Sequence, residues 1–266
     1  MNGKPRGAFH RMGMILLGLF IIRSPAATAA VSETDYENTN RVTGTIYEKR
    51  PEPRRVLFKF RRTATRSAST VRVLREYYPL EGSLAARERV VYEKGKLVSC
   101  ELEELQTGAK GRVVIGPDPQ KNNQPKLFFQ YTPRTGAPIE AKSEALRPDV
   151  LISDMIPWFV STHWEQLMKG SSVKFRFIVF QRAETIGFKL LKDSEGVWHG
   201  KPVVILRMEP TSLVIAQLVD PVFFTVEKSD GHRILQYVGR TTPMIKKGNK
   251  WEPLDAVSVF DFGTAE

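Results

Sequence analysis

The side chains best suited to hold a ligand are aromatic, and they concentrate between residues 158 and 188. His163 and Trp164 lie on the apolar face of a segment with 3–4 spacing, and two Phe residues share one face of the strand pattern that follows. Moving about ten methylene groups from water into a groove contributes roughly 8 kcal/mol before ordering costs. We therefore expect an apolar ligand site formed by Trp158, Phe159, His163, Trp164, Met168, Phe175 and Phe177.

The same side chains have a second interpretation. Aromatic residues at these spacings also fill an ordinary core, where each contributes about 1.5–3 kcal/mol on burial. His163 is then a hydrogen-bonded core histidine, whereas a position beside a ligand would give it a pH-sensitive role. The sequence leaves open whether the aromatic segment lines a groove or plugs it.

Residues typical of catalysis or metal binding lack the spacing that those functions need. His163, His199 and His232 include no i, i+4 pair, and no cysteine cluster accompanies them, so a zinc site of the usual kind is not expected. Ser171 and Lys174 match S-x-x-K, but they open a strand and lack the partner motifs of that chemistry. No G-x-S-x-G and no glycine-rich phosphate loop occurs. We expect no catalytic residue, no metal and no cofactor.

The first thirty residues have the three parts of a secretory signal peptide. Residues 12–22 form an apolar run too short to span about 30 Å of hydrocarbon as a helix, and residues 27–30 form a small-residue exit. The basic residues before the run are Lys4, Arg6 and Arg11. We expect cleavage after Ala29 or Ala30 and a periplasmic location. Because no cysteine stands directly after either cleavage point, we expect no lipid anchor at the new N-terminus. Residues 31–40 are expected to be a flexible lead-in.

Composition bounds the partners and the core. The net charge is +11 and stays positive without the first thirty residues, which favours peripheral contact with an anionic membrane or an envelope protein. Nucleic acid is not expected as a partner of an exported protein. Cys100 is the only cysteine, and it alternates with polar neighbours, so we expect it to be buried on a strand. The core must therefore hold the fold without an internal disulfide.

Alternating apolar and polar residues predict β-strands along most of the chain after residue 40. The expected fold class is α+β, with a strongly curved antiparallel β-sheet wrapped around one main amphipathic helix. We expect this sheet to be a half-barrel of about ten strands, within a single β-rich domain over residues 41–266. The strand patterns are 41–49, 56–65, 70–78, 89–93, 96–105, 111–115, 126–132, 172–181, 184–192, 201–208, 222–227, 233–239 and 256–262.

The main helix is predicted over residues 154–169. Ser153 is suited to the N-cap, Pro157 falls in the first turn, and Gly170 ends the helix. The preceding residues 133–150 contain three prolines and little apolar content, which indicates a long loop. We expect this loop to be a candidate lid over the aromatic groove.

Several segments resemble an uncharacterised family of exported (periplasmic) bacterial proteins. These segments are Val91–Val98, Ser153–Pro157 with the following His163-Trp164 and Leu167–Gly170, and Gly239–Pro243. The resemblance spans most of the mature chain and implies export, but it carries no assigned activity and transfers no functional residue. The expected architecture is also loosely similar to the half-barrel of periplasmic lipoprotein carriers of the Lol type, and fold alone does not fix function.

These observations favour a periplasmic, non-catalytic binding or carrier module for an apolar ligand, either a lipid or a lipoprotein acyl chain, in envelope maintenance. A protein-interaction module of the envelope with a filled core is the alternative, in which the sheet edge or the basic face meets a partner. A hydrolase of envelope components is a third possibility, which depends on proximities that the sequence does not show. The sequence indicates neither the oligomeric state nor the ligand.

Overall fold

Strand β2 (Val56–Ser67) illustrates how sequence alternation forms a wall of the sheet. Phe58, Phe60, Arg62 and Ala64 are buried in turn, while the residues between them are more exposed. A period of two places all four side chains on one face. Three of them are apolar, and the fourth, Arg62, requires an acidic partner in the interior because an unpaired buried charge is costly.

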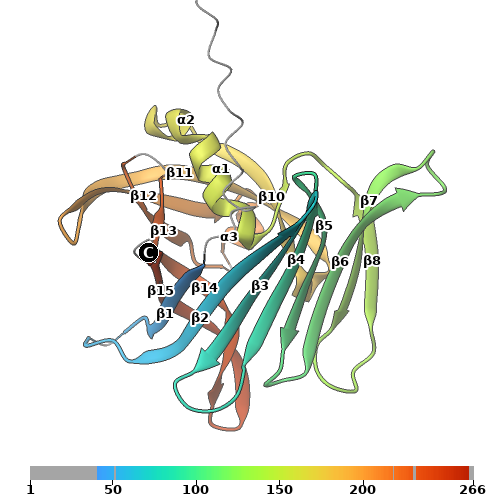
Figure 1. The fold of residues 1–266 in the computed structure, drawn as a ribbon, viewed down its shortest axis with the longest axis horizontal. Coiled ribbons are helices and arrows are strands. Elements are labelled where there is room, and N and C mark those ends of the chain that lie inside the picture. The colour runs from blue at the N-terminus through green and yellow to red at the C-terminus, as the bar shows by residue number, and fades with distance from the viewer. Residues whose placement is uncertain (1–40, 51, 218, 230–231, 264–266) are drawn as a thin grey trace, which may run out of the picture. The chain divides into compact units, whose positions relative to one another are not determined.

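The computed structural model describes residues 41–50, 52–217, 219–229 and 232–263 (Figure 1). The predicted signal peptide and lead-in, residues 1–40, lie outside the described residues. Fifteen strands of the described part form one sheet in the order β8-β7-β6-β5-β4-β3-β2-β1-β15-β14-β13-β12-β11-β10-β9. Their bounds are β1 Val42–Glu48, β2 Val56–Ser67, β3 Thr70–Pro79, β4 Ala86–Glu93, β5 Lys96–Glu104, β6 Ala109–Asp118, β7 Gln124–Thr132, β8 Glu140–Ala145, β9 Val150–Leu151, β10 Val173–Val179, β11 Glu184–Trp198, β12 Lys201–Pro210, β13 Val222–Glu227, β14 Ile234–Lys247 and β15 Lys250–Asp261.

The expected number of about ten strands is wrong, whereas the antiparallel character of the sheet is confirmed. All pairings between described strands are antiparallel except the short parallel pair of β9 and β10. Part of the segment 133–150, which we expected to be a loop, forms β8 and the start of β9. The residues of β8 are almost all exposed, so they show no apolar alternation, and backbone bonding to β7 alone places them in the sheet.

The helix predicted over 154–169 is divided. A 3-10 turn η2 (Ser153–Met155) leads into α1 (Ile156–Thr162), and α2 (Trp164–Met168) follows after a break at His163. The backbone of His163 has φ −106° and ψ 15°, outside the helical range. Its ring nitrogen Nδ1 donates to the carbonyl oxygen of Phe159 at 2.9 Å, an oxygen that the backbone N–H of His163 also uses. The other helical elements are η3 (Phe180–Arg182) and α3 (Leu213–Ala216).

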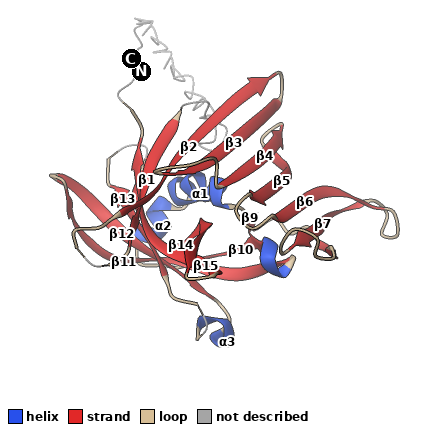
Figure 2. Ribbon diagram, turned by 90° about the horizontal axis from the view of Figure 1, so that it is seen from below, coloured by secondary structure: helices blue, strands red, loops and turns tan. Residues whose placement is uncertain are grey.

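The helical segment 153–168 lies on the inner side of the curved sheet (Figures 1 and 2). Its apolar face packs into a core to which both halves of the sheet contribute. The buried residues of the segment are Asp154, Met155, Ile156, Phe159, Val160 and Leu167. All but Asp154 are apolar, so the one-sided character predicted for this segment is what seats it against the sheet.

The sheet is open, and side chains bridge the seam between its two edges. Lys142 of β8 donates to the carbonyl oxygen of Arg182 at 2.9 Å. The carboxylate of Glu144, also on β8, accepts the backbone N–H of Thr185 at 3.1 Å. Because no backbone ladder joins β8 to β10 or β11, these contacts replace strand pairing at the seam.

The seam predicts a difference between two glycines of β6. A Cβ atom on Gly111 would lie 2.5 Å from the ring of Phe180, whereas one on Gly116 would lie 3.5 Å from the ring of Phe128. We expect Gly111→Ala to lower the free energy of unfolding by about 1–3 kcal/mol, because η3 must move away from β6. Urea denaturation measures this, with Gly116→Ala as the control. Equal stability of the two variants would contradict the close packing of the seam.

Candidate ligand-binding site

The structure separates the predicted site residues into a buried pair and a partly buried group. Phe159 and Phe175 are 5% and 1% exposed, and their ring centroids are 4.9 Å apart, so they contact each other within the core. Four further predicted residues pack against the same core and are only partly buried. These are Trp158, Trp164, Met168 and Phe177. His163 is also partly buried, with its ring centroid 4.3 Å from that of Phe159.

A surface pocket of about 640 Å³ lies beside α2. His163 and Trp164 line it, whereas Phe175 and Phe177 do not. The other lining residues are Ser161, Thr162, Glu165, Gln166, Lys169, Ser171 and His232. The pocket thus combines an indole and two imidazole rings with hydroxyl, amide and charged groups at its rim.

His232 is a site residue that the sequence did not indicate. It precedes β14, and its ring stacks on Trp164 with centroids 3.8 Å apart and planes 14° from parallel. The Nδ1 atom of His232 is buried and has no hydrogen-bond partner among the described residues. The sequence carries no signal for this stack, because the stack joins residues far apart in the chain and no local pattern reports such a contact.

Asp154, at the start of the helical segment, anchors that segment to the sheet. Arg62 of β2 and Arg75 of β3 are cross-strand partners on the inner face, where two like charges repel. One oxygen of Asp154 accepts Nε of Arg62 at 2.6 Å and Nη2 of Arg75 at 3.1 Å. The other accepts Nη2 of Arg62 at 3.1 Å and the hydroxyl of Tyr92 at 3.0 Å. The carboxylate therefore neutralises the two guanidinium groups and joins three strands to η2.

Glu88 extends this ionic network to β14. Its carboxylate lies 3.4 Å from Nη1 of Arg75 and accepts the hydroxyl of Tyr77 at 3.0 Å. Ser153 Oγ donates to it at 3.4 Å, and the hydroxyl of Thr242 donates to its other oxygen. Thr242 lies where the pairing of β14 with β15 is interrupted, between Thr241 and Ile245. Glu88 therefore holds the bend of β14 against β4.

The electrostatics of the network follow from burial and charge. Burial favours the neutral form of Asp154, but the charges of Arg62 and Arg75 and the hydrogen bonds from Arg62 and Tyr92 outweigh it, so its pKa lies below its ordinary value. Burial and the adjacent Asp154 charge raise the pKa of Tyr92. Near neutral pH the phenol therefore donates to an ionised carboxylate, an arrangement that stabilises a structure rather than transferring protons.

Glu104 of β5 is a buried carboxyl group outside this network. It is 4% exposed, and one of its oxygens has no hydrogen-bond partner among the described residues. Burial raises the pKa of Glu104 to about 8, although a backbone hydrogen bond from Met244 opposes the rise. Met244 belongs to the bend of β14, so the protonation of Glu104 is linked to the packing of that bend.

Other reactive groups are accounted for by the fold. Cys100 is buried as predicted, and burial raises the pKa of its thiol, which disfavours the reactive thiolate. Within the described ranges, no three His, Cys, Asp or Glu side chains are grouped to hold a metal ion. No helix in that part of the chain is long and apolar enough to cross a membrane.

Comparison with known proteins yields one structural similarity. No family model matches the chain, and no curated protein matches it. A solved structure, the beta-barrel-like protein of domain of unknown function DUF1849 from Brucella abortus, aligns with a TM-score of 0.37 and 6% identity. The alignment covers 83% of this chain and 94% of that protein. The function has to be inferred from the residues of the site themselves.

The anchor predicts a large cost for removing Asp154. We expect Asp154→Ala to lower the free energy of unfolding by about 3–5 kcal/mol, because it removes the carboxylate that binds the buried Arg62 through both oxygens and one of the two acidic partners of Arg75. Asp255→Ala is the matched control. Asp255 also binds one arginine through both oxygens, at 2.9 and 3.1 Å, but its side chain is 35% exposed, so we expect a cost of at most about 1 kcal/mol. Similar costs in urea denaturation would contradict the anchoring role.

Glu104 predicts a pH dependence of stability. Between its ordinary pKa of 4.5 and about 8, the folded protein holds a proton that the unfolded chain has lost. Unfolding then releases a proton, so stability falls as pH rises through this window, by up to about 1.4 kcal/mol per pH unit.

We expect Glu104→Gln to remove that slope when thermal unfolding is measured from pH 4.5 to 8. Glu103→Gln is the control, because Arg87 lowers the pKa of Glu103 and places its effect below the window. A slope that survives in Glu104→Gln would show that another group carries it.

Proposed function

We propose that this chain is a non-catalytic binding module of the bacterial cell envelope for an apolar ligand, either a lipid or an acyl chain. The proposed contact is the pocket beside α2, and the observation that supports it is the stack of His232 on Trp164. The indole of Trp164, held in place by this stack, supplies apolar ring surface of the kind that contacts a hydrocarbon chain in ligand pockets. The rim carries hydroxyl, amide and charged groups, which suit the polar end of an amphiphile.

The contact between Phe159 and Phe175 favours a ligand position outside the core. Phe159 and Phe175 contact each other and are buried, so the space between them is occupied. The accessible side of the aromatic segment is therefore its outer side. Trp158, Trp164 and Met168 are partly buried against that core and provide the exposed part of the apolar surface. In this proposal the ligand binds beside the helical segment, and Phe159 and Phe175 support the surface from below.

Two measurements test this proposal. Native mass spectrometry of the mature protein from its own periplasm should show a bound lipid, and a fluorescent acyl probe should bind to the emptied protein. We expect Trp164→Ala to weaken binding of the probe at least tenfold, because it removes the ring that faces His232.

The control is Trp198→Ala. Trp198 also contacts a histidine, His199, at 4.2 Å, but it does not line the pocket. Its probe affinity should equal that of the unsubstituted protein. Protein that arrives without lipid and takes up no acyl probe contradicts the proposal, as does equal weakening by both substitutions.

The filled core favours a protein-interaction module as the second candidate. β8 is an edge of the sheet, its residues are mostly exposed, and its polar composition is typical of edges kept from aggregating. A partner strand could add to such an edge. A hydrolase has less support, because the hydrogen bond that His163 makes is to a backbone carbonyl.

A further inference from the structure

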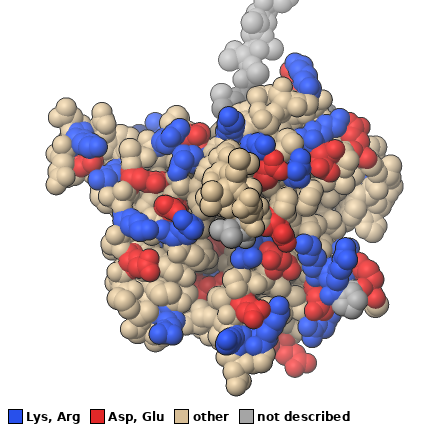
Figure 3. Space-filling model, turned by 180° about the vertical axis from the view of Figure 1, so that it is seen from behind, with Lys and Arg blue, Asp and Glu red and all other residues tan. Residues whose placement is uncertain are grey.

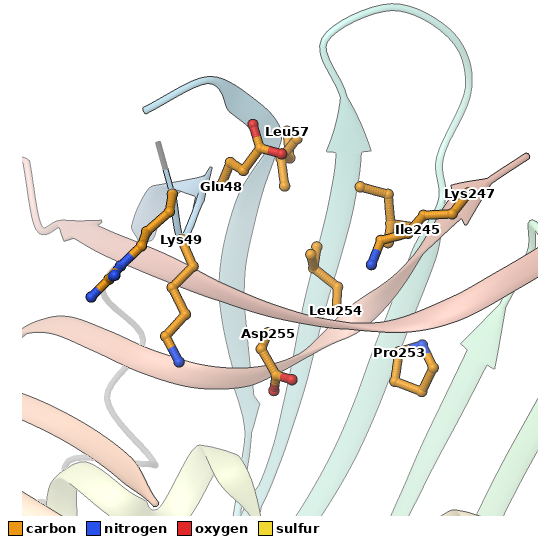
Figure 4. Close-up of a pocket in the computed structure, with 9 residues that line it drawn as sticks. Glu48, Lys49, Leu57, Ile245, Lys247, Pro253, Leu254 and Asp255 are labelled. Carbon is orange, nitrogen blue, oxygen red and sulfur yellow. The ribbon is translucent and has the colours of Figure 1, made fainter. Parts of the chain in front are cut away.

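A second pocket, of about 530 Å³, lies along β14 and shares no lining residue with the pocket beside α2 (Figure 4). The end of β1, the start of β2 and the β14–β15 hairpin form it. Its lining residues are Glu48, Lys49, Arg50, Leu57, Ile245, Lys247, Pro253, Leu254 and Asp255. None of these residues belongs to the site beside α2 or to the Asp154 network.

The floor of this pocket is apolar. Leu57, Ile245 and Leu254 point toward one another from three strands (Figure 4). Leu254 is 6% exposed and belongs to a second core cluster, against which Leu57 and Ile245 pack. The floor is therefore a fixed surface, because its side chains are held by the core beneath it.

The rim of the pocket carries an excess of positive charge. Each acidic residue near it has a basic partner, and these pairs are Glu48–Arg55, Glu52–Arg54, Glu252–Lys247 and Asp255–Arg240. Two basic side chains that line the pocket remain without an ion-pair partner in the described part of the chain. This basic rim is Lys49 and Arg50.

The unpaired basic rim lies on the segment that follows β1. Lys49 and Arg50 belong to this segment, and Lys247 of β14, which is paired with Glu252, also lines the pocket. Figure 3 shows Lys and Arg side chains spread over the face seen from behind, with Asp and Glu side chains among them.

We propose that this pocket receives the headgroup of an anionic membrane lipid and docks this end of the sheet on a membrane surface. The basic rim complements the phosphate charge, and the apolar floor contacts the adjoining glycerol and upper acyl carbons. Basic side chains near an anionic surface each strengthen adsorption about fivefold, and salt screens the attraction. This surface is separate from the ligand site beside α2, so either proposal can fail without the other.

Co-sedimentation of the mature protein with vesicles tests the docking. We expect binding to phosphatidylglycerol vesicles at low salt and little binding to phosphatidylcholine vesicles. Binding should be lost in about 0.5 M salt, because the Debye length falls to about 3 Å near 1 M and exposed charges are then screened. The double variant Lys49→Gln, Arg50→Gln should bind phosphatidylglycerol vesicles at least tenfold more weakly. Inorganic phosphate at millimolar concentration should not displace the protein, because it lacks the apolar part.

The control makes the same charge change elsewhere. The double variant Lys96→Gln, Lys174→Gln removes two exposed lysines that do not line the pocket. Lys96 begins β5, and the register through β4 and β3 aligns it with Ser67 at the end of β2, whereas Leu57 of the pocket lies at the start of β2. Its vesicle affinity should stay within about threefold of the unsubstituted protein. Equal loss in both double variants would show a response to net charge alone and overturn the proposal. Failure to sediment with anionic vesicles, or displacement by phosphate, would overturn it as well.

Discussion

The fold depends on the neutralisation of two arginines that face each other on the inner side of the sheet. Arg62 and Arg75 are cross-strand partners in rows that are otherwise apolar or aromatic, so the sheet alone would bury adjacent like charges. Asp154 removes this conflict from outside the sheet. Because taking the ions out of water costs several kcal/mol each, the arrangement is favourable only with all partners in place. The position of the helical segment is thereby fixed by charge as well as by apolar contact.

The same network joins residues from three segments that are far apart in sequence, residues 91–98, 153–157 and 239–243. Tyr92 comes from the first segment, Ser153 and Asp154 from the second, and Thr242 from the third. In the structure they meet at the carboxylates of Asp154 and Glu88. Sequence patterns of period two or 3.6 describe one strand or helix at a time, so they identified the segments without indicating the contact. The nearest signal was Arg62, a charged residue in an inward row.

How much of the fold the sequence predicts depends on burial. Each segment with apolar alternation forms a strand, because one of its faces lies on a core. Backbone pairing with a neighbouring strand makes some strands longer than the alternating segments that predict them. Gly116 and Pro117, which lie beyond the predicted strand 111–115, continue β6, and the turn lies at Asn122 and Asn123, where φ is 48° and 57°. β8 was not predicted because its residues are almost all exposed. Backbone hydrogen bonds place it in the sheet, and they require no alternation of apolar and polar side chains.

The candidate site shows the same limit at the level of tertiary contact. Periodicity selected Phe159 and Phe175 as lining residues of one groove, and in the structure their rings contact each other within the core. Whether two aromatic faces meet each other or leave space for a ligand depends on the distance between helix and sheet, which the anchor at Asp154 sets. His232 was beyond prediction because it reaches Trp164 only through a tertiary contact between residues far apart in the chain.

Residues on or next to β14 contribute to each of these features. His232, just before the strand, stacks on Trp164, Thr242 at its bend binds Glu88, and Ile245 near its end forms part of the second pocket. Glu88 contacts Arg75, and Arg75 contacts Asp154, so the bend is tied to the start of the helical segment through two ionic contacts. β14 and His232 before it thus contribute to both pockets and to the network between them. Thr242, which binds Glu88 at the bend, lines neither pocket, so the network and the two proposed surfaces use different residues on or next to the same strand.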